Sequence, residues 1–520
     1  DHNEEIWLGH GFRWEKRHTQ RMHDITKRDE SELIDYSTDD MGARWIHGLE
    51  TDEHALYQPI KHAEGHTLIL GTTGSGKTRL YDLLITQAIF RGEAVIVIDP
   101  KGDRELRDNM RRACEFMGEP DRFMFFHPGF PEDSVRVDPL ANFSRGTELA
   151  SRIAALIQTS SGGDVFKDFG QMALNNIIQG LLVCDMRPSL VNLRRYLEGG
   201  ADSLVIKAVR AYAEKSAPEF VSVIDREMDR LGDNTRQGKV AMAMVTLYRK
   251  EIQPEKPNSD LEGLLGMFEH DKTHFSKMVA SLLPIMNMLT SGDLGPLLSP
   301  DRRDEDDDRP IYDTRKMIDN NKVMYIGLDS LTDGMVGAAI GSIVLADLAA
   351  VAGDRYNYGV ALNPVNMFVD EAAEVINDPL IQLLNKGRGA YLRLWLASQT
   401  KSDVAARMGD ENKALQVLGN INNFVVLRIN DLESQTYIAD NMPKTRVNYV
   451  MRTQGMSSDS DPGFFSGQHG ERLMEEEMAL FQPERLGSLP NLEFVAKISG
   501  GHVFKGRLPI LLGQDDDDAA

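Results

Sequence analysis

Cysteine is scarce in this chain of 520 residues, which contains only Cys114 and Cys184. Two thiols cannot form the disulfide framework of a small secreted protein, so they indicate a reducing compartment such as the cytosol. Uninterrupted apolar runs of the length that spans a bilayer, about 18 to 20 residues, are also missing. No signal peptide is recognisable. The sequence therefore predicts a protein without a membrane-spanning segment.

Positive charge is in the minority, because 58 Lys and Arg face 80 Asp and Glu and the formal net charge is −22. Such a chain repels nucleic acid as a whole, so any contact with DNA must come from a local basic surface or an inner channel. One basic cluster lies near the start. It is typical either of the cytoplasmic flank of a membrane helix or of a solvated basic arm, and both remain open. Its members are Arg13, Lys16, Arg17, Arg21, Lys27 and Arg28.

Short apolar runs alternate with helical patterns in two parts of the chain, which predicts a parallel α/β sheet. Between them, from about 145 to 300, the periodicity is helical and there is hardly any strand signal. The acidic run 301–310 closes this region and is expected to be a solvated linker. The expected strands are 66–70, 94–99, 122–128, 322–328, 365–370, 391–399, 423–429 and 493–499. One α/β core is thus predicted to be split by a helical insertion.

The strongest motif is the sequence GTTGSGKT, which fits G-x-x-x-x-G-K-[ST] at every position. It lies between an expected strand and an expected helix, the context in which this motif binds phosphate. Its glycines let backbone N–H groups point at the phosphates, Lys77 reaches the β- and γ-phosphates, and the Thr78 hydroxyl binds Mg²⁺. The predicted nucleotide-binding residues are Gly71, Thr72, Thr73, Gly74, Ser75, Gly76, Lys77 and Thr78.

Magnesium needs a further carboxylate at the end of a buried strand beside this loop. Two expected strands end in Asp, at Asp99 and Asp370, and only the second is followed by another acid, Glu371. We expect Asp370 to hold the metal and Glu371 to activate the attacking water, although a purely structural Asp-Glu pair is the alternative. Asp99 opens the stretch DPKGD, which contains Lys101 and Asp103. Whether that stretch belongs to the site or is an ordinary turn remains open.

Two more polar residues follow the acid pair. Gln399 ends the expected strand 391–399, where it can sense the γ-phosphate. Arg388 lies eleven residues earlier in a turn flanked by glycine. It could project into the nucleotide site of a neighbouring subunit, and such an arginine finger contributes about 10³–10⁵ in rate. The alternative is an ordinary surface arginine.

The segment 442–455, MPKTRVNYVMRTQG, has a net positive charge, whereas the chain as a whole has a net negative charge. It contains Lys444, Arg446 and Arg452 and no acid. We expect a basic loop that contacts DNA or a neighbouring subunit, with Tyr449 available to stack on a base. A solvated loop is the alternative.

Together these motifs resemble, in order and over nearly the whole chain, the conjugative coupling ATPases of the TraD/TraG family. The phosphate loop alone is generic, but its combination with both ends of the chain is specific. The opening WLGHGFRWEKRHTQR looks like that of TraD proteins of the SXT/TOL subgroup. The other matching segments are VIDPKGD, VDPLANF, MFVDEAAEV, GRGAYLRLWLASQT and LPNLEFVAKISGGHVFKGRLPIL.

The resemblance implies a hexameric, RecA-like DNA motor that brings the relaxase-bound transfer strand to a type IV secretion channel at the bacterial inner membrane. It implies ATP and Mg²⁺ as cofactors, with DNA, relaxosome proteins and the secretion channel as partners. The residue roles that it implies are Lys77 and Thr78 for nucleotide and metal, Asp370 and Glu371 for metal and water, Gln399 as sensor and Arg388 as finger in trans.

Pattern and resemblance together predict the domain layout. A RecA-like domain is expected over 61–145 and 310–512, an all-α domain over 146–300, an acidic linker at 301–309 and an acidic tail at 513–520. Residues 1–60 are expected to follow a membrane anchor. Members of the family usually begin with membrane helices, so either these were removed or the chain is an unusual soluble member at the cytoplasmic side of the inner membrane.

Two other functions remain to be weighed. One is a double-strand DNA translocase of the chromosome-partitioning type, which the helical insertion disfavours. The other is a nucleotide-dependent docking switch that does not hydrolyse ATP. Glu371 disfavours the switch, because a pure switch needs no acid that activates water.

Overall fold

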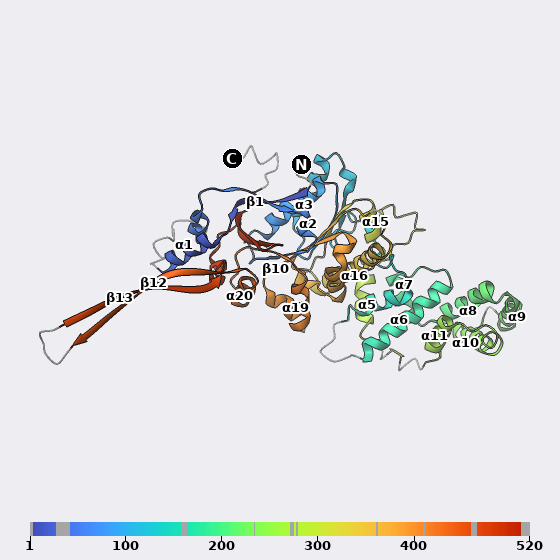
Figure 1. Cartoon of the computed structure of the whole chain (residues 1–520). Helices are drawn as coiled ribbons and strands as arrows, with labels where there is room; N and C mark the ends of the chain where they lie inside the picture. The colour runs from blue at the N-terminus through green and yellow to red at the C-terminus, as the bar shows by residue number, and fades with distance from the viewer. Residues whose placement is uncertain are drawn as a thin grey trace.

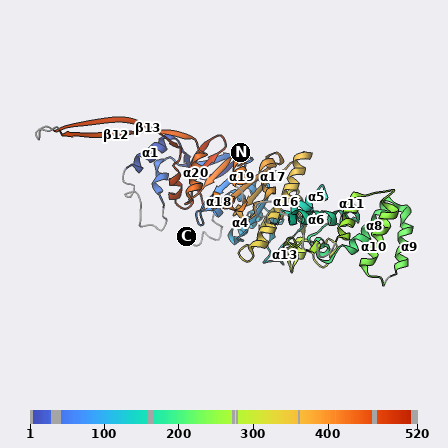
Figure 2. The ribbon, with the colours of Figure 1, turned by 90° about the horizontal axis from the view of Figure 1, so that it is seen from below.

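The computed structural model describes residues 4–27, 42–157, 165–232, 234–270, 275–276, 279–359, 362–408, 411–458 and 465–510. The acidic tail 513–520 and Arg28 of the basic cluster lie outside these ranges. The molecule is elongated: a central sheet carries a helical region at one end and a long β-hairpin at the other (Figure 1). The view from below shows the same three parts in line (Figure 2).

An 11-stranded sheet forms the centre, in the order β2-β1-β15-β14-β11-β3-β10-β9-β4-β8-β5. The strands from β11 to β5 are parallel, as the alternating pattern predicted. They and the antiparallel β14 (Glu493–Ile498) coincide with the eight expected strands. The parallel strands are β3 (Thr67–Leu70), β4 (Ala94–Asp99), β5 (Phe123–Phe126), β8 (Val323–Gly327), β9 (Val365–Val369), β10 (Leu392–Ser398) and β11 (Asn423–Val426).

Helices cover both faces of this sheet. Alternate side chains of β4 enter two different cores: Val95 and Val97 pack with α3 (Lys77–Phe90) and α4 (Arg104–Phe116), while Ile96 packs with the helices on the other side. Those include α16 (Gly334–Tyr358) and α17 (Asp378–Lys386). Continuous apolar strands buried on both faces are what a parallel sheet between two helical layers requires. The predicted α/β fold class is confirmed.

Helix α16 corrects the premise of one prediction from the sequence, namely that no segment is long and apolar enough to span a bilayer. By length and composition it is apolar enough to cross a membrane, which the search for uninterrupted apolar runs missed because Asp347 lies within it. Most of this helix is buried inside the protein. The core helix of a folded domain passes the same test, so α16 alone does not indicate a membrane span.

The N-terminal segment belongs to the main sheet. β1 (Glu5–Arg13) pairs antiparallel with both β2 (His54–Pro59) and β15 (His502–Arg507). The basic residues that follow lie on the ordered helix α1 (Lys16–Thr26), whose other face is buried. The described part of the basic cluster is therefore not a free arm, and the first and last described strands, β1 and β15, are neighbours in the sheet.

The helical region leaves and re-enters the core at one place. β6 (Arg136–Val137) and β7 (Ile311–Tyr312) pair in parallel at its two ends. The Arg136 guanidinium donates to the carbonyls of Asp307 and Arg309 at 2.7–2.9 Å, so the end of the acidic linker is held against the core. The helices are α5 (Gly146–Ala154), α6 (Val165–Val183), α7 (Leu190–Gly199), α8 (Asp202–Ser216), α9 (Val221–Leu231), α10 (Gln237–Leu247), α11 (Ser259–Glu269), α13 (Leu283–Thr290) and α14 (Leu294–Leu298).

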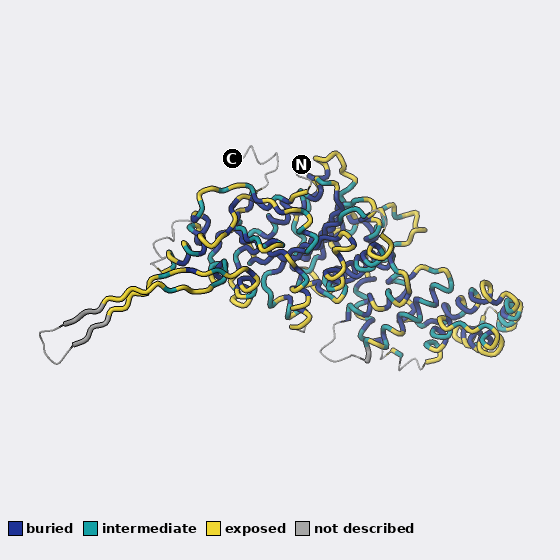
Figure 3. The backbone as a smooth tube through the Cα atoms, in the orientation of Figure 1, coloured by how far each residue is buried: buried dark blue, intermediate teal, exposed yellow. Residues whose placement is uncertain are grey.

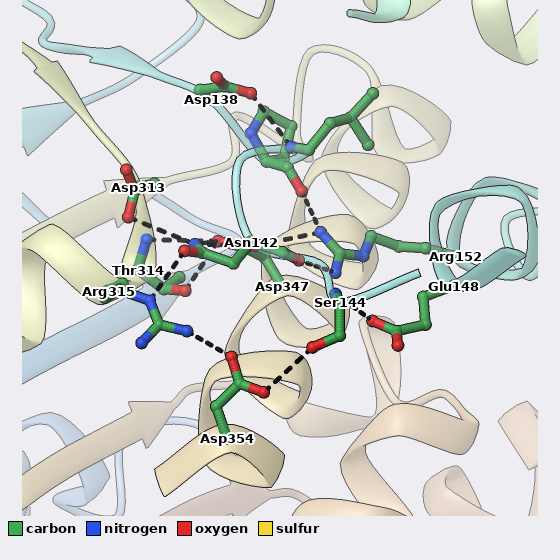
Figure 4. Close-up of polar contacts among 12 residues, drawn as sticks. Asp138, Asn142, Ser144, Glu148, Arg152, Asp313, Thr314, Arg315, Asp347 and Asp354 are labelled. Atoms are coloured by element: carbon green, nitrogen blue, oxygen red, sulfur yellow. Dashed lines mark hydrogen bonds and ion pairs between the residues drawn. The ribbon is translucent and has the colours of Figure 1, made fainter. Parts of the chain in front are cut away.

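A buried polar network joins this region to the core (Figure 4). Asp347 of α16 accepts hydrogen bonds from Arg152 of α5 at 3.0 Å, from Asn142 at 3.1 Å and from the Thr314 hydroxyl at 2.7 Å. Thr314 begins α15 (Thr314–Asp319), just after β7. The network thus ties together the outgoing chain, the returning chain and the core helix.

The prediction that residues 442–455 form a loop is wrong. This segment lies almost entirely in β12 (Lys444–Ser458), which pairs antiparallel with β13 (Phe465–Ala479) to form the projecting hairpin. Most of its described length is exposed (Figure 3). Near its base, α1 packs against it: the Gln20 side chain both accepts from and donates to the backbone of Asn448, at 2.8 and 2.9 Å.

Candidate active site

The order of four adjacent strands brings the predicted site residues together. β3, β10, β9 and β4 are neighbours and parallel, so their carboxyl ends meet at one edge. The phosphate loop follows β3, Gln399 follows β10, Asp370 follows β9, and Asp99 ends β4. Ligands bind at this edge in open α/β sheets.

The phosphate loop has the backbone that its glycines were expected to allow. Gly74 and Gly76 have φ of +78° and +117°, and Gly76 is the N-cap of α3. Side chains rarely adopt such angles, so glycine is needed there. The Lys77 ammonium donates to the Gly71 carbonyl at 2.6 Å and to the Thr72 carbonyl at 3.4 Å. Burial lowers the pKa of Lys77.

Asp370 occupies a position that favours a cation. Burial, together with the nearby charges of Asp99 and Glu371, raises the pKa of its carboxyl to about 6. A divalent ion would relieve this repulsion, and Thr78, in the first turn of α3, supplies the kind of oxygen that Mg²⁺ takes. The residues present therefore fit a magnesium ion that also binds nucleotide phosphates.

Glu371 is held by two donors and a strained backbone. Its Oε1 accepts from the Lys101 ammonium at 2.7 Å and from the Gln399 amide at 3.0 Å. Its φ is +40°, an angle that costs a non-glycine residue about 1–3 kcal/mol. Although burial acts in the opposite direction, these donors and the charge of Lys77 lower its pKa. Gln399, predicted as a phosphate sensor, thus contacts the predicted base directly.

The stretch after Asp99, whose role the sequence left open, forms an ordered turn. The Asp99 carboxylate accepts from the backbone N–H of Lys101 at 2.9 Å, from that of Asp103 at 2.7 Å and from the Tyr325 hydroxyl at 2.5 Å. These bonds orient Lys101 toward Glu371. The sequence signal for Lys101 was present, a lysine directly after a strand that ends at the phosphate edge, but nothing in the sequence indicated Tyr325.

Arg388 lies away from its own site. It sits in the turn before β10, with its side chain 72% exposed and 4.0 Å from Glu64. Since β10 runs from there toward the phosphate loop, more than about 20 Å of strand separates Arg388 from Gln399. Arg388 therefore cannot reach the nucleotide of its own subunit. The only nucleotide that it could contact is one bound to another subunit.

The hairpin does not present a purely basic surface. Each cation has an acid on the neighbouring strand: Lys444 lies 4.0 Å from Glu477, Arg446 3.8 Å from Glu475, and Arg452 3.0 Å from Glu471. The acids lie on β13, beyond the segment 442–455, and only the pairing of the two strands brings them beside the cations. The Tyr449 ring packs beside His23 and Lys27 at the end of α1 and is half-buried, so it is not a free platform for a base.

Two family models match the chain, one on each side of the helical region. Residues 364–491 match the model described as the TraM recognition site of TraD and TraG, and residues 56–149 match the central domain of helicase HerA. The first contains Asp370, Glu371 and Gln399, and the second contains the phosphate loop. A comparison with curated proteins finds no match.

Solved structures with the same fold span almost the whole chain. The bacterial conjugative coupling protein TrwBΔN70 superposes with a TM-score of 0.57 at 15% identity, covering 93% of this chain and 92% of its own. TrwB in complex with the ATP analogue ADPNP gives 0.56 at 15% identity, with 98% and 95% covered. VirB4 of Thermoanaerobacter pseudethanolicus gives 0.50 at 13% identity, with 93% and 99% covered. The RecA-like fold with a helical insertion is thereby established.

Proposed function

We propose that this chain, which belongs to the TraD/TraG family, is an ATP-driven DNA translocase that couples relaxase-bound DNA to a type IV secretion channel during conjugation. The observation that carries the proposal is the convergence of Lys77, Asp370, Glu371 and Gln399 at one edge of the sheet, in a chain with the TraD/TraG domain. Membership of the SXT/TOL subgroup remains a prediction.

ATP and Mg²⁺ are the proposed cofactors, as in TrwB, which is described in complex with ADP and Mg²⁺ and with ADPNP. Lys77 and the amides of the phosphate loop would bind the phosphates, and Thr78 and Asp370 would hold the metal, which would neutralise phosphate charge. Glu371 accepts a proton from the attacking water, and Gln399 fixes the Glu371 carboxylate at 3.0 Å.

The proposed assembly is a homo-hexamer at the cytoplasmic side of the inner membrane. Arg388 of each subunit would reach the nucleotide of the next, which its exposed position at the far end of β10 supports. Relaxosome proteins are proposed partners of residues 364–491, from the description of the matching family model. The hairpin with Lys444, Arg446 and Arg452 is proposed as a contact to a neighbouring subunit or protein partner rather than to DNA, because its charges are paired.

Steady-state ATP hydrolysis with and without single-stranded DNA tests this function. We expect turnover that single-stranded DNA stimulates. Stimulation by double-stranded DNA alone would instead support the chromosome-partitioning type of translocase. Nucleotide binding without turnover would support the docking switch and overturn the assignment of Glu371.

A further inference from the structure

Two lysines of the site are engaged by groups of the protein itself. The Lys77 ammonium is bound by the carbonyls of Gly71 and Thr72, and the Lys101 ammonium is bound by Glu371 at 2.7 Å. Burial lowers the pKa of Lys77 most; the charges of Glu371 and Asp370 raise it, and the charge of Lys101 lowers it. Both cations lie at the edge where nucleotide phosphates are expected, so a polyanion that binds there competes with the protein groups that hold them.

Lys101 lies in an ordered turn that hydrogen bonds hold in place. Asp99 fixes the backbone on both sides of it through the N–H groups of Lys101 and Asp103. Tyr325 in turn holds the Asp99 carboxylate and is itself almost fully buried. The side chain of Lys101 is nevertheless 44% exposed, whereas that of Glu371 is 9% exposed. The ion pair can therefore open by a movement of Lys101 alone, and the Gln399 amide still donates to the Glu371 carboxylate when it does.

Resting on the proposed ATPase function, we propose that Lys101 is a γ-phosphate-directed residue that exchanges partners when ATP binds, leaving Glu371 for the terminal phosphate. The exchange is one event with two results: the triphosphate gains a second cation, and the Glu371 carboxylate loses its ion pair and becomes available to the attacking water. ADP, which lacks that phosphate, leaves Lys101 on Glu371.

Because of this exchange, the effects of Lys101 and Glu371 on the free energy of ATP binding are coupled. Breaking the Lys101–Glu371 pair costs free energy and so weakens ATP binding. A substitution of Glu371 that weakens this pair must therefore tighten ATP binding. The effect requires Lys101, because Lys101 is the residue that moves to the terminal phosphate. Binding of ADP must be insensitive to both residues, because the exchange does not occur.

The test is a set of equilibrium titrations of the full chain with the imido analogue of ATP and with ADP, each with Mg²⁺. We expect Lys101→Met to weaken the analogue about tenfold, the size of one charge-assisted hydrogen bond at a partly exposed site, and ADP less than about twofold. Lys101→Arg should restore most of the preference for the analogue. Glu371→Gln should bind the analogue about threefold more tightly, and this gain should vanish when it is combined with Lys101→Met.

Lys256→Met serves as the matched control, because Lys256 makes an ion pair of 2.6 Å with Glu219 in the helical region, outside the site. Equal loss of analogue and ADP affinity in Lys101→Met would overturn the proposed role of Lys101, as would a gain from Glu371→Gln that persists without Lys101. Failure of the unaltered chain to bind either nucleotide would overturn the ATPase assignment and this role together.

Discussion

At the scale of single residues, Glu371 has a strained backbone conformation and a side chain that two hydrogen-bond donors hold in place. Its φ is positive, and its carboxylate accepts hydrogen bonds from Lys101 and Gln399. Backbone strain of this kind persists where surrounding bonds fix it, and it concentrates at functional sites. The sequence predicted Glu371 because two acids follow a buried strand. It could not predict the ion pair, because Lys101 is 270 positions away and only the strand order brings it near.

Glu371→Gln should bind ATP and hydrolyse it at least about 100-fold more slowly, because the amide keeps the volume of the side chain but cannot accept the proton. Nucleotide binding and turnover are measured on the same preparation. Glu374→Gln is a control on the same turn. A variant that fails to bind ATP would make Glu371 a structural residue or a metal ligand.

At the scale of elements, the sequence predicted best what depends on local pattern. The eight expected strands are present because each is a short apolar run, and all except the edge strand β5 are largely buried. The sequence did not reveal β1, β2 and β15 as partners, because their pairing joins the two ends of the chain. It also missed the hairpin, since β12 and β13 are mostly polar and show no buried face over most of their described length.

The junction network predicts an effect on stability. Asp347→Ala leaves Arg152 buried without its counter-charge, and breaking a buried pair in this way costs about 3–5 kcal/mol of unfolding free energy. Urea unfolding measures it. Asp225→Ala, which removes an exposed partner of Arg210, should cost less than about 1 kcal/mol. Equal effects of the two variants would show that the network contributes little.

The paired charges of the hairpin predict that removing its cations leaves the salt dependence of DNA binding unchanged. Replacing Lys444, Arg446 and Arg452 together by Ala should leave the log–log salt slope of single-stranded DNA binding as it is, because each cation already faces a glutamate. If all three neutralised phosphates, the slope would flatten by about 2. Such flattening would return the hairpin to the DNA path.

At the scale of the whole molecule, a net charge of −22 and a DNA-moving function are compatible only if DNA meets a restricted surface. A ring of subunits supplies one by enclosing a channel. The position of Arg388, at the far end of β10 from its own nucleotide site, is compatible with the proposed ring.

Arg388→Ala should lower turnover by about 10³ or more while leaving ATP binding intact. Arg230→Ala, whose side chain is equally exposed in the helical region, should have no effect. Mixing Arg388→Ala subunits with Glu371→Gln subunits should restore part of the activity, because the second kind supplies the arginine to the intact site of the first. Mixtures that remain as inactive as either variant alone would contradict a finger in trans.

The measurement that tests the central claim most directly is ATP-dependent displacement of streptavidin from the end of a biotinylated single-stranded DNA. We predict that the unaltered chain displaces streptavidin when ATP and Mg²⁺ are present, and that Lys77→Ala and Glu371→Gln do not. ATP hydrolysis by the unaltered chain without displacement of streptavidin from either end of the DNA would contradict the account of this protein as a DNA motor.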